Sequence, residues 1–328
     1  MTNMNVKKLW IIGIFMTLAS FAIFYVRQIT IERVTLYHES LPKAFDGFRI
    51  LQIGDFYGEN FGTNQEQLVK HIQTESVNLI LFTGNYTRGY PHDLAPLERV
   101  LTEIPTDVPA YFILGETDTD AFPELVEGNT FYDLFTRYNI KSLYPGIVLT
   151  RGDEQIYLTK DYYSEYYTPL EELQKRYRHW KLSSEPANLK LLEKSEEYAY
   201  LERDFISTYK KVDEPFTIQV VYEAISVTQY DLYLRQVEQL LLSVGHTDSE
   251  WMDWDISLST QVHSASVSSL TSTNEALEDS LSSKQRVQYV TPGLSTNYFK
   301  QSFLNRLFKK PVISVIELRT KPLLGEKI

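Results

Sequence analysis

Residues 48–58 read FRILQIGDFYG, an apolar β-like run followed at once by a glycine and a short polar tip. The same pattern recurs in residues 77–87, VNLILFTGNYT, and in residues 109–118, PAYFILGETD. The segments between these runs have the composition of helices, and the order strand–helix–strand–helix–strand predicts a layered α/β domain with a parallel core. In open α/β sheets, ligands collect beyond the carboxyl ends of the strands. The three polar tips are therefore expected to line one crevice.

Sequence patterns give the limits of the helices and strands expected in the first half of the chain. Thr63-Asn64-Gln65-Glu66 has the form of a capping box, which satisfies the free amides at the start of a helix that runs to about Thr74. A second helical pattern covers Leu94–Thr102. The strands are assigned by their apolar runs or alternation to Ile29–Tyr37, Phe48–Ile53, Val77–Phe82 and Pro109–Leu114.

The composition argues against several classes of function. The 328 residues include no cysteine, which removes disulfides, thiolate metal ligands and cysteine nucleophiles. The formal net charge of -11 argues against nucleic acid as a partner, because binding to its backbone needs clustered Lys and Arg. The short basic stretch RLFKK at residues 306–310 is typical of a solvated loop.

An uncharged run of 18 residues, Leu9–Val26, stands near the N-terminus. A bilayer-spanning helix needs about 20 apolar residues, or slightly fewer. Lys7 and Lys8 precede the run, and the positive-inside tendency then leaves the bulk of the chain outside the cytoplasm. A cleaved signal peptide is the alternative, but the run ends in Phe24-Tyr25 rather than at a small-residue cleavage site. The sequence thus predicts a single-pass protein of the cell membrane with a cytoplasmic tail at 1–8, an anchor at 9–26 and an extracytoplasmic domain at 27–328.

Strand-like runs return in the second half of the chain. A hairpin is predicted from Ile147–Arg151 and Gln155–Lys160, and a helix over Leu232–Val244. An insertion rich in tyrosine and charge covers residues 161–211. Later strands are expected at Phe216–Tyr222, Asp255–Ser259, Val287–Val290 and Val312–Leu318.

Together these segments resemble the calcineurin-like metallophosphoesterase family, in particular its membrane-anchored bacterial branch. That family carries ordered blocks of the form D-x-H-G, G-D, G-N-H-D, a later lone His, G-H-x-H and a closing Y-V-x-x-G-L-G-T. The corresponding blocks of this chain, in the same order, are Asp55–Gly58, Gly84-Asn85, Gly115–Asp118, Val221–Ala224, Thr260–His263 and Tyr289–Thr296. The resemblance implies a layered α/β/β/α sandwich of the metallophosphoesterase type, preceded here by one transmembrane helix.

The resemblance also implies a site for two metal ions, and most of its ligands are replaced in this chain. Asp55 and His263 keep the ligand type that the family has at their positions. The histidine that contacts the phosphate in the family corresponds to Thr117, so no catalytic residue is carried over there. The five other ligand positions carry Tyr57, Asn85, Glu116, Tyr222 and Gln261.

The exchange of the bridging aspartate for Asn85 has the largest consequence. Two divalent cations about 3.5–4 Å apart repel by about 18 kcal/mol even at an effective dielectric constant of about 20. An anionic bridge makes such a pair tolerable, whereas Asn85 offers a neutral oxygen. Neutral Tyr and Gln are also poor substitutes for imidazole. The binuclear centre is not expected to form, and no cofactor is expected.

A single hard cation is the alternative to an empty site. Asp55, Glu116 and His263, helped by the Asn85 oxygen, offer ligands that Mg²⁺, Mn²⁺ or Ca²⁺ accept. The resemblance therefore still allows a remnant site for one metal ion at these residues.

The same residues also have a purely structural interpretation, which we prefer for each of them. Asp55 then caps the turn that follows it, and Asn85 bonds to local backbone. Tyr57 and Tyr222 fill the space that metal ions occupy in the family. The crevice itself remains a candidate binding site.

A second segment, Gly245-His246-Thr247-Asp248, is closer in letters to G-H-x-H than the one chosen. It follows the predicted helix Leu232–Val244, where Gly-His is typical of a helix stop. Asp255–Ser259, in contrast, has the pattern of a strand that leads to Gln261 and His263. His263 is therefore preferred, and His246 is the alternative.

Three functions are compatible with these observations. The first is a metallophosphoesterase-like pseudoenzyme, anchored in the membrane, that acts by binding or scaffolding at the cell surface. The second is an active hydrolase with a remodelled single-metal site, acting on a lipid-linked or other phosphate ester. The third is capture of an unknown protein by the tyrosine-rich insertion, whose simpler role is packing over the sheet.

Overall fold

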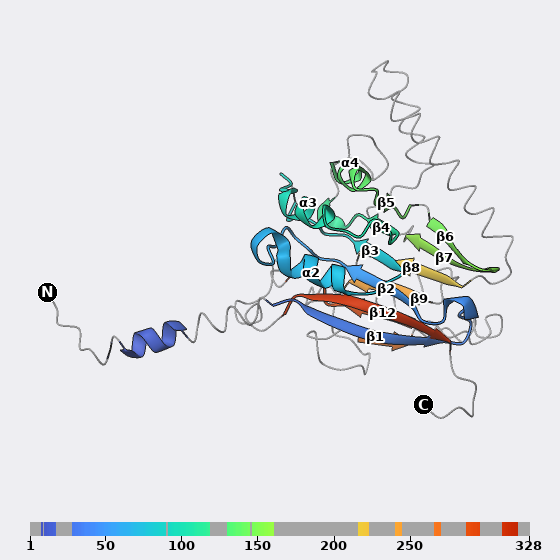
Figure 1. Ribbon diagram of the computed structural model, residues 1–328, viewed down its shortest axis with the longest axis horizontal. Helices are drawn as coiled ribbons and strands as arrows, with labels where there is room; N and C mark the ends of the chain where they lie inside the picture. Colours follow the sequence, from blue (N-terminus) through green and yellow to red (C-terminus); the bar gives the residue numbers. More distant parts are fainter. Residues whose placement is uncertain are drawn as a thin grey trace, which may run out of the picture.

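The computed structural model describes residues 8, 10–17, 28–89, 91–118, 130–144, 146–160, 216–222, 240–244, 266–269, 287–295 and 310–320. Their strands form two six-stranded sheets. Three α-helices, α2, α3 and α4, accompany them (Figure 1). The domain is therefore mixed α/β, as the element order of the sequence predicts.

The first sheet has the strand order β1-β12-β2-β3-β4-β5. Strands β2 to β5 are parallel, which confirms the predicted parallel core. Strands β1 and β12 are parallel to each other, and β12 is antiparallel to β2. In order across the sheet, the strands are Thr30–His38, Val312–Thr320, Phe48–Ile53, Leu79–Thr83, Ala110–Ile113 and Lys141–Ser142.

The second sheet has the strand order β10-β11-β9-β8-β7-β6. Strands β6 and β7 form the predicted antiparallel hairpin. Strands β7, β8, β9 and β11 run parallel to one another, and β10 is antiparallel to β11. In order across the sheet, the strands are Ser266–Ser269, Val287–Thr291, Leu240–Val244, Thr217–Val220, Glu154–Lys160 and Gly146–Arg151.

The alternation of side chains along β2 explains how the layers pack. Leu51 and Ile53 belong to one buried cluster, which also contains the apolar side chains of the three helices. Ile50, on the opposite face, belongs to a second cluster shared with β7, β8 and β9 of the other sheet. The described residues therefore form three layers: helices, first sheet and second sheet. The fourth layer of the predicted α/β/β/α sandwich falls on residues outside those described.

Two helices, α2 and α3, lie close to their predicted positions, and α4 was not predicted. Helix α2 is Glu66–Thr74, α3 is Ala95–Leu101 and α4 is Thr130–Arg137. Short 3-10 helices cover Lys43–Phe45, Thr63–Gln65 and Glu116–Asp118.

The predicted capping box at the start of α2 is wrong. No side chain caps the helix start, and Gln65 there has a left-handed backbone. Its buried amide instead accepts a hydrogen bond from the Phe61 N–H (2.8 Å) and donates to the carbonyl oxygens of Glu59 and Pro96. A buried glutamine thus holds the loop after β2 against α3, and the tertiary contact overrides the local pattern.

The prediction of a helix over Leu232–Val244 is wrong for its last five residues. Leu240–Val244 is strand β9, which lies between β8 and β11. Residues 232–239 lie outside those described. An apolar run such as LLLSV suits a buried strand as well as a buried helix, because both bury every side chain.

Near the N-terminus, residues 10–17 are helical and their large apolar side chains are exposed. Within the part of the chain that the structure describes, no helix is both long and apolar enough to cross a membrane. Residue 9 and residues 18–26 of the predicted anchor lie outside that part.

Candidate functional site

The loops after β2, β3 and β4 meet at one end of the first sheet, as the sequence predicts. The Asp55 N–H donates to the carbonyl oxygen of Gly84 at 3.1 Å, and the Tyr57 N–H donates to that of Asn85 at 2.8 Å. The Gly58 N–H donates to the Tyr86 carbonyl oxygen at 2.8 Å. Because parallel strands end at the same edge, these backbone bonds hold the first two polar tips side by side.

Glycines allow the loops to approach this closely. A Cβ on Gly84 would lie 2.7 Å from the Gly115 nitrogen and 3.0 Å from the Tyr222 Cβ. A Cβ on Gly293, in the loop after β11, would lie 2.7 Å from the Cβ of Asp55. Both glycines also have positive φ angles, a conformation that other residues adopt only with strain. The site therefore depends on glycine at positions where segments that follow five strands touch.

Three of the predicted site residues carry backbone strain. Asp55, Tyr57 and Asn85 have φ angles of 54°, 46° and 58°, in the left-handed region. Such conformations cost about 1–3 kcal/mol each and persist where the surrounding structure holds them, often at functional sites. The rest of the fold therefore offsets the conformational free energy of these three residues at this edge.

Asn85 lies at the centre of the site and is fully buried. Its Nδ2 donates to Oδ1 of Asp55 at 3.0 Å. Its Oδ1 accepts hydrogen bonds from the Thr117 N–H at 3.2 Å and from the Thr117 hydroxyl at 3.3 Å. The backbone N–H of Thr117 can only donate, so it fixes which end of the amide faces Asp55. The amide thus directs N–H groups, not lone pairs, at the carboxylate.

Asp118 organises the loops, a role that the sequence analysis missed. Its buried carboxylate accepts hydrogen bonds from the backbone N–H groups of Asn85 (2.6 Å), Tyr86 (2.7 Å), Gly115 (3.0 Å) and Thr87 (3.4 Å). Burial raises its pKa to about 7, although the four N–H groups act in the opposite direction. A carboxylate three residues after the glycine of the third block was the available signal, because loop amides at a strand end need an acceptor.

The two residues before Asp118 in the third block are less buried than Asp118. Glu116 is exposed, whereas Thr117 is half-buried and donates its hydroxyl to the Thr87 carbonyl oxygen at 2.7 Å. Thr117 therefore ties the third block to the second, in addition to its bonds to Asn85. The assignment of Glu116 as a metal ligand stays a prediction.

The two predicted space-filling tyrosines are both buried, with Tyr57 at 4% and Tyr222 at 9% exposure. Tyr222 follows β8 and lies against the Gly84 loop. Tyr57 belongs to the strained loop after β2. Aromatic side chains thus occupy positions where the resemblance implies imidazole ligands.

A loop near the C-terminus closes the site from the second sheet. The Leu294 N–H donates to the carbonyl oxygen of Gly54 at 2.9 Å, and the Val312 N–H donates to that of Gly293 at 2.9 Å. Just behind this loop, the hydroxyls of Thr291 and Ser314 lie 2.7 Å apart, and the Tyr289 hydroxyl donates to Ser314 at 2.9 Å. Buried hydrogen bonds therefore hold the loop that packs against Asp55.

The correction at β9 changes the choice between the two histidines. Val244 ends this strand, and its side chain lies near both Gly54 and Gly293. Gly245 and His246 therefore follow a strand that ends at the site, and the argument for a helix stop no longer holds. His246, His263 and Gln261 lie outside the described residues, so the assignment of either histidine as a ligand stays a prediction.

The described part of the site does not fit a binuclear metal centre. Asn85 presents N–H groups to Asp55, and Tyr57 and Tyr222 offer no imidazole. Within the described ranges, no three His, Asp or Glu side chains are grouped as metal ligands. Amide hydrogens and a cation cannot share the same lone pair of a carboxylate. The hydrogen bonds of Asn85 thus cross-link the loops after β2, β3 and β4.

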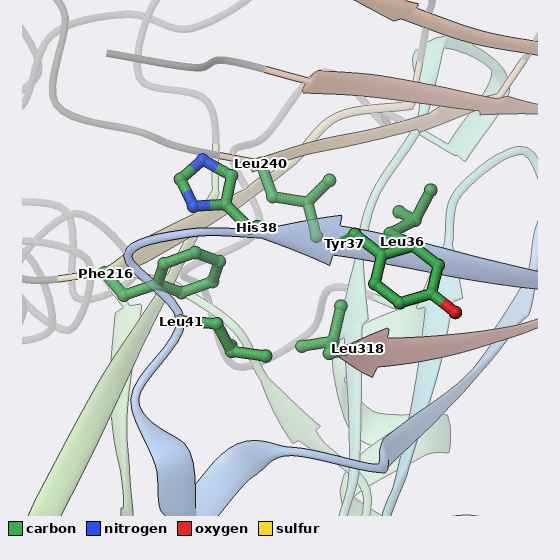
Figure 2. Close-up of a pocket in the computed structure, with 7 residues that line it drawn as sticks. All are labelled: Leu36, Tyr37, His38, Leu41, Phe216, Leu240 and Leu318. Atoms are coloured by element: carbon green, nitrogen blue, oxygen red, sulfur yellow. The ribbon is translucent and has the colours of Figure 1, made fainter. Parts of the chain in front are cut away.

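The pocket drawn in Figure 2 lies at the opposite end of the sheets. His38 and Leu318, which line it, stand near the carboxyl ends of β1 and β12, and β12 runs antiparallel to β2. The remaining lining residues are Leu36, Tyr37, Leu41, Phe216 and Leu240. This hollow is apolar and separate from the loops that carry Asp55.

Comparisons with known proteins identify a matching family. Residues 48–240, more than half of the chain, match the family model of the calcineurin-like phosphoesterase. No curated protein sequence shows a significant match. Among solved structures, the phosphopantetheinyl hydrolase PptH from Mycobacterium tuberculosis is 11% identical, with a TM-score of 0.33, 61% of this chain and 83% of that chain covered. Vps29 from Chaetomium thermophilum is also 11% identical, with a TM-score of 0.28 and coverages of 77% and 75%.

Proposed function

The chain belongs to the calcineurin-like phosphoesterase family, and we propose that it is a membrane-anchored pseudoenzyme of that family. In this proposal the chain lacks the binuclear metal centre and acts by binding or scaffolding at the cell surface. Its partner is a phosphate-ester ligand or a protein. The anchor is the apolar run Leu9–Val26, with most of the chain outside the cytoplasm.

The observation that carries the proposal is the pair formed by Asn85 and Asp55. The amide N–H occupies the carboxylate lone pair at 3.0 Å, and Thr117 holds the amide in this orientation from the other side. A bridging ligand must direct lone pairs at both cations, which a donating amide group cannot do. The hydrogen bond therefore replaces the metal bridge as the link between the loops.

The exchange at Thr117 supports the same conclusion. A general acid must deliver a proton to the leaving group, and a threonine hydroxyl at neutral pH is a poor proton donor compared with an imidazolium group. In this chain, the Thr117 hydroxyl is also engaged with the carbonyl oxygen of Thr87. The two exchanges, at Asn85 and at Thr117, thus both support the proposal of a pseudoenzyme.

The experiment combines metal binding with activity, using the full-length chain purified in detergent. Wild-type protein is equilibrated with Mn²⁺, Zn²⁺ or Mg²⁺, and is then assayed for bound metal, for melting temperature and for turnover of phosphate mono- and diesters. We expect no metal-dependent rise in the melting temperature and no turnover above the no-enzyme control. Turnover that disappears in Asp55→Ala would reject the proposal and favour the active single-metal hydrolase.

The variant Asn85→Asp tests the role of the amide directly. It places a second carboxylate against Asp55 and removes the donor, which lowers the free energy of unfolding by about 1–3 kcal/mol without metal. A divalent cation should restore that loss, because it provides the charge that two facing carboxylates need. A wild-type protein stabilised by Mn²⁺ as strongly as Asn85→Asp contradicts the idea that the hydrogen bond replaces the metal.

A further inference from the structure

Strand directions place the start of β1 at the same edge as the site. Strand β1 is parallel to β12, with Thr30 opposite Val312. Strand β12 is antiparallel to β2, with Ser314 opposite Gln52, and the same register continued by two residues brings Val312 opposite Gly54. Thr30, Val312 and Gly54 thus lie on one line across the sheet, and Figure 1 shows β1 and β12 running side by side.

This line is short. Neighbouring strands lie 4.7–4.9 Å apart, so Thr30 is about 10 Å from the end of β2, where Asp55 begins the site loop. Direct bonds support the alignment: the Thr30 N–H donates to the Pro311 carbonyl oxygen at 2.8 Å, and the Val312 N–H donates to that of Gly293 at 2.9 Å. Gly293 in turn packs against Asp55.

The connection between the apolar run and β1 is short. Ile29 is 8% exposed and packs in the cluster between the helices and the first sheet. Only Arg27 and Gln28 separate it from Val26, the last residue of the apolar run. Three residue steps of extended chain span at most about 11 Å. Ile29 therefore stays within about 11 Å of the end of a membrane span that closes at Val26.

From these distances we propose that the sheet edge carrying Asp55, Asn85 and Thr117 faces the bilayer surface, so that the ligand of this site is membrane-borne. This inference rests on the anchoring in the proposed function. The opposite end of β1, nine residues further along, points away from the membrane. The short connection leaves the domain no room to turn this edge outward.

The charges at this edge fit an anionic lipid surface. Lys310 directly precedes Pro311, which bonds to Thr30, and Arg306 and Lys309 come just before it in the chain. The chain as a whole is acidic, with a formal net charge of -11, and is repelled by anionic lipids. Lys310, next to the anchored edge, is attracted to anionic headgroups, so it favours this edge as the one that approaches the bilayer.

The absence of cysteine from the chain allows a direct test of orientation. Asn60→Cys and Ser40→Cys each place one label at an exposed position, after β2 at the site edge and after β1 at the far edge. The full-length variants are reconstituted in vesicles of phosphatidylcholine and phosphatidylglycerol that contain lipids with a headgroup nitroxide. The fluorescence of each label is then compared with and without the nitroxide.

The expected result is a large difference between the two labels. Nine residues of β1 separate the edges by about 30 Å, so the nitroxide should quench the label at position 60 about threefold or more over the label at position 40. In another outcome, the protein stays in the vesicles after a carbonate wash and yet shows equal quenching of the two labels, or stronger quenching at position 40. That result overturns the orientation alone. Protein removed by that wash shows that the anchoring itself is wrong.

A longer connection provides the matched control. A Gly/Ser insertion of about 12 residues between Gln28 and Ile29 has an end-to-end distance of about 20 Å and lets the domain turn freely. In vesicles of phosphatidylcholine alone, the difference between the two labels should then fall by more than half. An unchanged difference in the extended variant contradicts the claim that the short connection sets the orientation.

Discussion

At the end of the first sheet where β2, β3 and β4 finish, buried hydrogen bonds hold strained loops together, whereas at the opposite end apolar side chains do the packing. The first end contains Asp118 with four backbone donors and Asn85 between Asp55 and Thr117. The second contains leucines and an edge-to-face contact of His38 with Phe216, with ring centroids 5.1 Å apart (Figure 2). The same sheets thus end in two different kinds of structure.

Strained backbone at the polar end coincides with buried hydrogen bonds between the loops. Left-handed backbone at Asp55, Tyr57 and Asn85 is retained although the described ligand set does not suit two metal ions. Hydrogen bonds are directional, so the polar end tolerates few replacements, whereas apolar packing depends mainly on volume. Substitutions at the polar end should therefore lower the free energy of unfolding more than substitutions at the apolar end.

Removal of the Asp118 carboxylate should have the largest effect. Asp118→Ala leaves four buried N–H groups without their acceptor, and each such group costs about 1–3 kcal/mol, so a loss of about 4 kcal/mol or more in the free energy of unfolding is expected. Urea denaturation of the full-length chain measures it. Asp107→Ala removes an exposed carboxylate and should change stability by less than about 0.5 kcal/mol. Similar losses in the two variants contradict the organising role of Asp118.

The apolar end should lose less and should accept an isosteric exchange. Leu240 is 2% exposed and lines the hollow of Figure 2. Leu240→Ala should cost about 2–3 kcal/mol, because a buried leucine side chain is deleted. Leu240→Met should cost less than about 1.5 kcal/mol, since the volume is kept. Asp118→Asn is equally isosteric, and if denaturation shows it to be as mild as Leu240→Met, the contrast between the ends is wrong.

Alanine substitutions at two glycines distinguish the cost of steric contact from the cost of backbone strain. Gly84 and Gly89 have φ angles of 90° and 108°, but only Gly84 has neighbours within 4 Å of an added Cβ. Alanine at either position meets the same penalty for positive φ, whereas Gly84→Ala also overpacks the loop against Gly115 by about 1–3 kcal/mol. The difference in melting temperature between the two variants measures this second effect. Equal losses would show that the loops can separate without cost.

The last effect, a pH dependence of stability, should be the smallest when it is expressed per pH unit. Burial raises the pKa of Asp118 from 3.8 to about 7 in the folded chain, so the folded state holds this proton more tightly than the unfolded state. The stabilisation from the bound proton is complete below about pH 4 and is lost as the pH rises to about 7, with a slope of at most about 1.4 kcal/mol per pH unit. Urea denaturation from pH 5 to pH 8 should show this slope in wild type and a shallower one in Asp118→Asn. An identical slope in both proteins assigns the dependence to other groups.

Part of this arrangement was predictable from local sequence. The run Phe48–Ile53 is a strand over the residues predicted, and the glycine and polar tip after each parallel strand place Asp55 and Asn85 together. These features depend on periodicity and on the common edge of parallel strands, which adjacent residues specify. The burial of Tyr57 and Tyr222 also agrees with their predicted role as space-filling side chains.

Other features depend on contacts between distant segments. Gln65 forms part of an apparent capping box but is buried against the loop after β2, and Leu240–Val244 pairs as a strand although a helix was predicted there. The helix predicted over Leu232–Val244 is a sequence pattern, and its last five residues form β9. For Gln65 and for β9, long-range contacts outweigh a weak local preference. The prediction of His263 over His246 rested on the local pattern and lost its basis with the strand at β9.

By itself, the amino-acid sequence determined the strand runs, the family resemblance and the loss of the usual ligand types at positions 57, 85 and 222. The tertiary structure alone decided the orientation of the Asn85 amide, the four donors of Asp118 and the alignment of Thr30 with the site edge. The physical reason is that residue types are local, whereas the direction of a hydrogen bond and the register of strands depend on groups that folding brings together.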